Sequence, residues 1–214
     1  RDLVRSRGLG DVYKRQYTFT ATCLLCLVEP FVAIWLGQAF VLTKAILILA
    51  VAIYYFKGIN SGIDIAKNAA GLYYPDRFIP MAEAIANMVI SIVLAKRYGI
   101  AGVLFGTLVS FLALSFWAKP YFVCRDVFEV SFARYAVREG REIVVSVLVA
   151  AGTWYAVSLV SLENVLLSFG VKALLALALS NGLLLLVYFK TSEFQYLRGL
   201  LESAANRIGK RKKA

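Results

Sequence analysis

Histidine is missing from all 214 positions of the chain, and cysteine occurs only three times. Zinc and non-haem iron sites in proteins usually depend on histidine, so we expect no bound metal. Cys23 and Cys26 form a C-x-x-C motif, but it lies inside an apolar segment without the βαβ pattern that accompanies redox pairs. Packing among helices and lipid is therefore the favoured role of these cysteines, and we expect no cofactor.

Charged residues are also scarce, at 17% of the chain against about 25% in average globular domains. Apolar residues make up 60% and gather in segments of 18 or more, long enough for a helix to cross a hydrocarbon core of about 30 Å. Six segments qualify: Tyr17–Gly37, Ala39–Phe56, Phe78–Ala95, Tyr98–Ala118, Ile143–Leu162 and Val165–Phe189. The sequence predicts an all-α, polytopic membrane helix bundle.

Lysine and arginine are concentrated in every second connection between these segments. One set holds fifteen basic residues: Lys57, Lys67, Arg77, Lys119, Arg125, Arg134, Arg138, Arg141, Lys190, Arg198, Arg207, Lys210, Arg211, Lys212 and Lys213. The other set holds only Lys96 and Arg97, apart from Lys44 and Lys172 near segment ends. Basic connections stay in the cytoplasm, so we expect a cytoplasmic carboxyl terminus. Residues 1–16 contribute +3 of the net charge of +11, and this distribution accounts for the remaining +8 without nucleic acid binding.

The chain divides into three parts. Residues 1–16 are polar, and Asp11–Gln16 resembles the translation of an adapter used to prepare DNA for sequencing. We interpret residues 1–16 as such a translation, expect it to be disordered, and expect the natural protein to extend further at its amino end. The alternative is a basic amphipathic arm. Residues 17–190 form the transmembrane bundle, and residues 191–214 form a basic cytoplasmic tail suited to anionic lipids.

The second segment is expected to continue beyond the membrane. Ile59, Ile63, Ala66 and Ala70 recur at helical spacing, which predicts an amphipathic extension after a loosening at Gly58, ended by Pro75. An aromatic belt is expected near segment ends, formed by Tyr54, Tyr55, Tyr73, Tyr74, Trp117 and Tyr121.

From Pro30 to Phe128 the chain resembles bacterial polysaccharide flippases, of the superfamily that also includes multidrug-and-toxin exporters. Three groups of residues carry the resemblance: Pro30–Phe31 with Trp35–Gly37; Ala69–Arg77 with Pro80, Glu83–Ala84 and Asn87; and Ser91–Leu94, Tyr98–Val103, Gly106–Thr107, Trp117, Pro120–Tyr121 and Val127–Phe128. The resemblance implies a bundle around a central cavity, of which this chain would be the carboxyl-terminal part.

The resemblance also implies a function. Such a protein would move undecaprenyl-linked oligosaccharide for O-antigen (lipopolysaccharide), capsule or exopolysaccharide across the cytoplasmic membrane by alternating access, with no enzymatic step. Its partners would be the lipid-linked oligosaccharide and membrane lipids, with a polysaccharide polymerase and a chain-length regulator as further candidates. A drug–cation antiporter of the same superfamily is the alternative. A membrane polysaccharide polymerase is a weaker one, because the external connections are short and lack histidine.

Four residues are candidates for the substrate pathway. Glu83 and Asn87 are four residues apart in the third segment and point the same way. They would serve as a polar lining for the substrate, as a carboxylate that exchanges a cation, or as an interhelical hydrogen bond. Lys67 and Arg77 flank the entry to that segment, where they would either bind a lipid pyrophosphate or only mark the cytoplasmic side.

Other polar and small residues within the segments are assigned to packing. Glu29 beside Pro30 is interpreted as a packing or interface residue, with proton coupling as the alternative. Gly99, Gly102 and Gly106 lie on one stripe of the fourth segment, which favours close helix packing over substrate contact.

Overall fold

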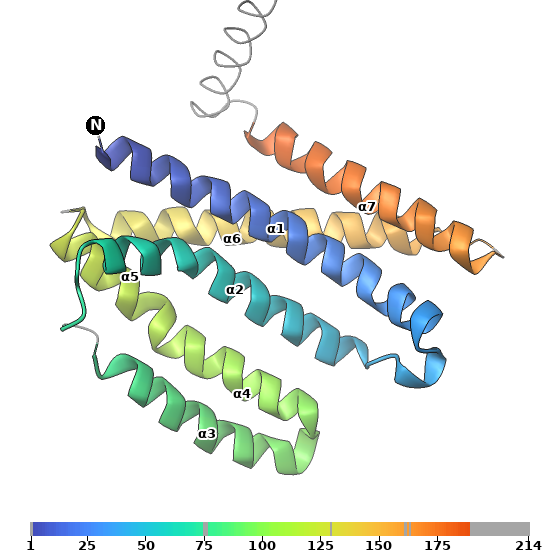
Figure 1. Ribbon diagram of the computed structural model, residues 1–214, viewed down its shortest axis with the longest axis horizontal. Coiled ribbons are helices and arrows are strands. Elements are labelled where there is room, and N and C mark those ends of the chain that lie inside the picture. The colour runs from blue at the N-terminus through green and yellow to red at the C-terminus, as the bar shows by residue number, and fades with distance from the viewer. Residues whose placement is uncertain (1, 75–76, 129, 161, 163, 189–214) are drawn as a thin grey trace, which may run out of the picture.

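The computed structural model describes residues 2–74, 77–128, 130–160, 162 and 164–188 (Figure 1). Within these ranges all regular structure is helical, which confirms the predicted fold class. The elements are α1 (Asp2–Trp35), the 3-10 helix η1 (Gln38–Phe40), α2 (Lys44–Ala69), α3 (Ile79–Tyr98), α4 (Ile100–Ala113), α5 (Ser115–Asp126), α6 (Phe132–Ser158) and α7 (Val165–Tyr188). The basic tail at 191–214 lies outside the described residues.

Six stretches of the described chain are long and apolar enough to cross a membrane, with α4 and α5 together forming one of them. The chain is therefore a polytopic membrane protein in its architecture. Consecutive spans run in alternating directions, so the bundle has two ends (Figure 1). We call the end that holds the connections 70–78 and 127–131 the basic end. The opposite end holds η1, Gly99 and the connection from α6 to α7.

Helix α1 is the central element of the bundle. It packs against α2, α6 and α7, while α3 packs on α4 and α5 at one edge (Figure 1). The apolar core between α1, α2, α4 and α5 is built from Ala21, Tyr55, Ile59, Phe111 and Phe116. Tyr55 is only 8% exposed, so it is a core residue and not part of the predicted aromatic belt.

Several element boundaries differ from the sequence-based expectation. The second span starts at Lys44 and not at Ala39, because η1 occupies Gln38–Phe40. It then runs without interruption through Gly58 to Ala69, so the predicted extension is present but the loosening is not. Helix α6 starts at Phe132, eleven residues before the predicted Ile143. Hydropathy missed this first part because it contains charged residues, two of which, Glu139 and Glu142, are buried.

The amino-terminal segment is also helical. Helix α1 begins at Asp2, so residues 2–16 are not disordered as expected. A formed helix lengthens at little cost, since each added residue gains one backbone hydrogen bond. Lys14 forms an ion pair with the buried Glu139 at 2.5 Å, which connects this segment to α6. The interpretation of residues 1–16 as an adapter translation stays a prediction.

Two of the three glycines assigned to packing lie at the contact between α3 and α4. A Cβ atom on Gly102 would lie closer than 3.0 Å to the backbone of Leu94, and one on Gly106 would lie equally close to Ser91. Gly99 has another role: its φ of +57° forms the turn that ends α3, and nothing lies near its Cβ position. Helices α3 and α4 therefore form a tightly packed hairpin.

Replacing Gly102 with alanine is expected to destabilise this hairpin. The added methyl group meets backbone, which cannot move aside as a side chain can, and such overpacking typically costs about 1–3 kcal/mol. Gly152→Ala in α6 is the matched control, because nothing lies within 4 Å of its Cβ position. Thermal unfolding in detergent should show a lower midpoint for Gly102→Ala only. Equal midpoints for the two variants would contradict this packing.

The two ends of the bundle should be reached by reagents from opposite sides of the membrane. Because basic connections are retained in the cytoplasm, we expect the basic end to face the cell interior. A membrane-impermeant maleimide should label Gln38→Cys in intact cells and Asn68→Cys only after permeabilisation; both positions are exposed in the structure. The chain with its native cysteines alone is the control. Labelling of Asn68→Cys in intact cells would reverse the orientation.

Candidate functional site

The fourth span is broken in its middle. Helix α4 ends at Ala113 and α5 begins at Ser115, with Leu114 between them at φ −111° and ψ −75°. Pro120 lies inside α5, where it has no N–H to donate to the carbonyl one turn earlier. Irregular backbone within a membrane span is tolerated where protein or a cavity surrounds it, and such breaks accompany binding sites in transporters.

Glu83 of α3 lies directly at this break. The hydroxyl of Ser115, the first residue of α5, donates a hydrogen bond to the Glu83 carboxylate. Ser115 is fully buried. The structure thus shows Glu83 in an interhelical hydrogen bond, and this bond connects α3 to the far side of the break.

Asn87 lies one turn further along α3. Its Oδ1 atom accepts hydrogen bonds from the hydroxyls of Ser91, at 2.8 Å, and of Thr107 in α4, at 3.3 Å. Glu83 and Asn87 therefore both bond across to the α4–α5 span, on one face of α3 as their spacing predicts. Asn87 holds the α3–α4 hairpin together, whereas Glu83 bonds to α5.

Beside the break, toward the basic end, lies an apolar cavity of about 480 Å³. We call it the aromatic pocket, because four of its lining residues are Phe78, Trp117, Tyr121 and Phe132. Phe132 contacts two of the other rings: its centroid lies 5.6 Å from that of Tyr121 and 6.3 Å from that of Trp117. Leu114 at the break and Ala82 beside Glu83 also line the pocket.

Arg77 lies at the rim of the aromatic pocket. Its guanidinium carbon is 4.3 Å from the ring centroid of Tyr74 and 4.5 Å from that of Phe78, which is a pocket residue. The side chain is exposed. Contacts with aromatic rings attract a cation through the ring quadrupole, and they leave its full positive charge in place. The rings therefore hold a charged guanidinium next to an apolar cavity.

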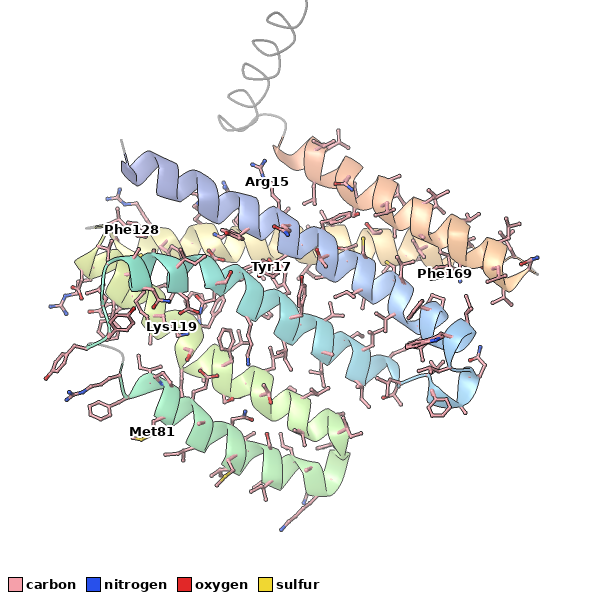
Figure 2. The ribbon with its side chains drawn as sticks, in the orientation of Figure 1. Arg15, Tyr17, Met81, Lys119, Phe128 and Phe169 are labelled. Atoms are coloured by element: carbon pink, nitrogen blue, oxygen red, sulfur yellow. The ribbon has the colours of Figure 1, made fainter. Side chains whose placement is uncertain are left out.

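Lys67 lies in the last turn of α2, at the same end of the bundle as Arg77. Near it, Asp64 of α2 forms an ion pair with Lys119 of α5 at 2.9 Å, and Figure 2 shows Lys119 where α5 passes α2. This pair connects α5 to α2, and so to the main body of the bundle. Lys67 and Arg77 thus lie at the basic end of the bundle, near the start of α3. Glu83 and Asn87 lie further along α3 and are not at the pocket rim with Arg77.

Sequence reasoning missed three parts of this site. The break at Leu114, the Ser115 hydroxyl that bonds to Glu83, and the aromatic pocket were not predicted. Pro120 in an apolar span was the one available signal, since proline interrupts helical hydrogen bonding. In the described ranges no three acidic or cysteine side chains gather as a metal site would require.

Comparisons with known proteins add no relatives. No family model, no curated protein and no solved structure matches the chain. The likeness to polysaccharide flippases therefore stays a prediction from the sequence.

Removing the hydroxyl of Ser115 is expected to destabilise the chain, because the Glu83 carboxylate then loses its partner within the membrane. Leaving such a group unsatisfied typically costs about 1–3 kcal/mol. Ser158→Ala is the control, since its exposed hydroxyl donates to the carbonyl of Tyr155 in its own helix. A double-mutant cycle with Ser115→Ala and Glu83→Gln, followed by thermal unfolding, should give a coupling of about 0.5–3 kcal/mol. Strictly additive effects would contradict the bond.

Proposed function

We propose that this chain is part of a transporter that moves undecaprenyl-linked oligosaccharide across the cytoplasmic membrane by alternating access. The observation that carries the proposal is Arg77, an exposed cation held at the rim of an apolar aromatic pocket. This combination suits an amphiphile with an anionic head and a long apolar tail. A lipid-linked oligosaccharide is such a molecule, because a pyrophosphate joins its sugars to its prenyl chain.

The head group would bind to the guanidinium. Arginine presents its N–H donors in a planar fork that matches two phosphate oxygens at once. Tyr74 and Phe78 restrict the side chain before the ligand arrives, so less conformational entropy is lost on binding. Lys67 lies at the same end and adds positive charge there.

Part of the prenyl chain would enter the aromatic pocket. Its volume of about 480 Å³ falls within the usual range of ligand pockets, and its lining is almost wholly apolar. A 480 Å³ pocket holds only a segment of so long a chain, and the rest stays in the bilayer. The sugars would cross the membrane along a polar surface outside the aromatic pocket, because the pocket lining is almost wholly apolar.

The broken span supplies an element that can move. Helices α3 and α4 form a rigid hairpin through Gly102, Gly106 and Asn87. Beyond the break, the Asp64–Lys119 ion pair connects α5 to α2. Leu114 would thus serve as a hinge between these two units, which also contact each other where α4 packs on α2, and the bond from Glu83 to Ser115 crosses it. Movement at such a hinge is how alternating access is produced when one bundle rocks against another.

Exchange of a cation at Glu83 is the second part of this proposal. A proton or metal cation on the carboxylate would weaken the bond to Ser115, because the hydroxyl donates to the charged form. The hinge would then respond to an ion gradient. By the positive-inside rule the basic end faces the cytoplasm, where the lipid-linked sugar is assembled.

Arg77→Ala is expected to weaken binding of undecaprenyl pyrophosphate by about tenfold, corresponding to about 1.4 kcal/mol. Arg77→Lys should lose less, because it keeps the charge but not the two-pronged geometry. Arg97→Ala is the matched control, since Arg97 is an exposed arginine near the other end of α3. Binding would be measured on the full chain in detergent micelles, by native mass spectrometry.

The same variants can be tested in the cell that makes the protein. Arg77→Ala and Glu83→Gln should each reduce surface polysaccharide at normal expression levels. Unchanged export in both variants would contradict the proposed pathway. Binding of a lipophilic cation, lost in Glu83→Gln and kept in Arg77→Ala, would instead favour the drug–cation antiporter.

A further inference from the structure

A second cavity, of about 360 Å³, lies among α1, α2 and α6, away from the aromatic pocket. Most of its lining residues are alanine, leucine, isoleucine, valine and phenylalanine. It extends from the interior of the bundle to the opposite end, where Glu29, Lys44 and Trp154 line its mouth. We call it the α1–α2–α6 cavity. The residues proposed above for oligosaccharide transport do not line it.

The mouth of this cavity carries two opposite charges. Glu29 comes from the end of α1 and Lys44 from the start of α2, on either side of η1. In the part of the chain that the structure describes, no ion pair within 4.0 Å joins them. The Lys44 ammonium instead lies 5.9 Å from the ring centroid of Trp154. A carboxylate and an ammonium therefore both face one apolar cavity without neutralising each other directly.

The closed part of the cavity contains hydroxyl groups that already have partners. Thr18 donates to the carbonyl of Lys14 at 2.8 Å and also bonds to Ser146 across the helix contact at 2.8 Å. Thr22 donates to the carbonyl of Thr18 at 2.8 Å. Because these hydroxyls are satisfied within the protein, an apolar chain can lie against them without leaving a polar group unpaired.

We propose that the α1–α2–α6 cavity binds a zwitterionic phospholipid with a primary amine, namely phosphatidylethanolamine. The lipid phosphate would contact the Lys44 ammonium, the lipid ammonium would contact the Glu29 carboxylate, and one acyl chain would fill the apolar part. Trp154 suits this position, since tryptophan is enriched where the hydrocarbon core meets the head groups. The site recognises both charges of the head group, so a lipid with an anionic head alone fits it less well.

The charge arrangement also determines how related lipids should rank. Phosphatidylglycerol keeps the phosphate but has no cation for Glu29. Phosphatidylcholine keeps the cation, yet its methylated nitrogen has no N–H to donate to a carboxylate. The order of affinity is therefore phosphatidylethanolamine first, then phosphatidylcholine, then phosphatidylglycerol.

Native mass spectrometry of the full chain, titrated with each of these three lipids in detergent, tests the proposal. We expect phosphatidylethanolamine to bind about 3- to 10-fold more tightly than phosphatidylglycerol, because only the former donates a charge-assisted hydrogen bond to Glu29. Glu29→Gln should remove this preference. Lys44→Gln should weaken binding of both lipids, and Lys172→Gln in α7, outside the cavity, should change neither.

Filling the cavity provides an independent test. Ala150→Phe places a ring in the space proposed for the acyl chain and should reduce binding of all three lipids, while both charges remain. Leu148→Phe is the control, because Leu148 lies on α6 but is 66% exposed and does not line the cavity. Thermal unfolding of each variant shows that it is folded. Equal affinity for the three lipids, or wild-type binding in Glu29→Gln and Lys44→Gln, would overturn the proposal.

Discussion

The constraint on which this structure depends is that the bilayer interior offers no water to its polar groups. Polar groups inside a span are therefore stabilised by partners within the protein, although among the described residues the buried side chains of Asn60 and Thr153 have none. Thr18 bonds to Ser146, Asn87 accepts from Thr107, and Glu83 accepts from Ser115. The last bond matters most, because it satisfies a carboxylate at a place where the helix is interrupted. The same hydrogen bond satisfies the Glu83 carboxylate and joins the two sides of the break.

That interaction divides the bundle into units of different stiffness. The α3–α4 hairpin is held by close backbone contact at Gly102 and Gly106. Helix α5 belongs to the larger unit through the Asp64–Lys119 pair and its packing on α2 and α6. The two units meet at Leu114, at the hydrogen bond from Ser115 to Glu83, and at the packing of α4 on α2. A rearrangement of this protein at Leu114 would therefore also have to open the packing of α4 on α2, where Phe111 belongs to the apolar core.

The two cavities differ in chemistry as well as position. At the basic end, the exposed guanidinium of Arg77 lies beside aromatic rings, which suits an anionic head on an apolar tail. At the opposite end, a carboxylate and an ammonium share one mouth, which suits a zwitterion. Helix α1 lines the second cavity but not the first. A transported lipid and a resident lipid could therefore be bound at the same time without competing for side chains.

The sequence alone determined the number of spans, their alternating basic connections and the shared direction of Glu83 and Asn87, because hydropathy and helical spacing are properties of neighbouring residues. It did not determine where α6 begins, since the buried Glu139 and Glu142 look like surface charges until α1 is packed against them. Nor did it reveal the break at Leu114, the aromatic pocket or the position of Glu29 and Lys44 at one cavity mouth. Each of these depends on side chains far apart in sequence, or on a local backbone geometry that packing selects, so only the tertiary structure decided them.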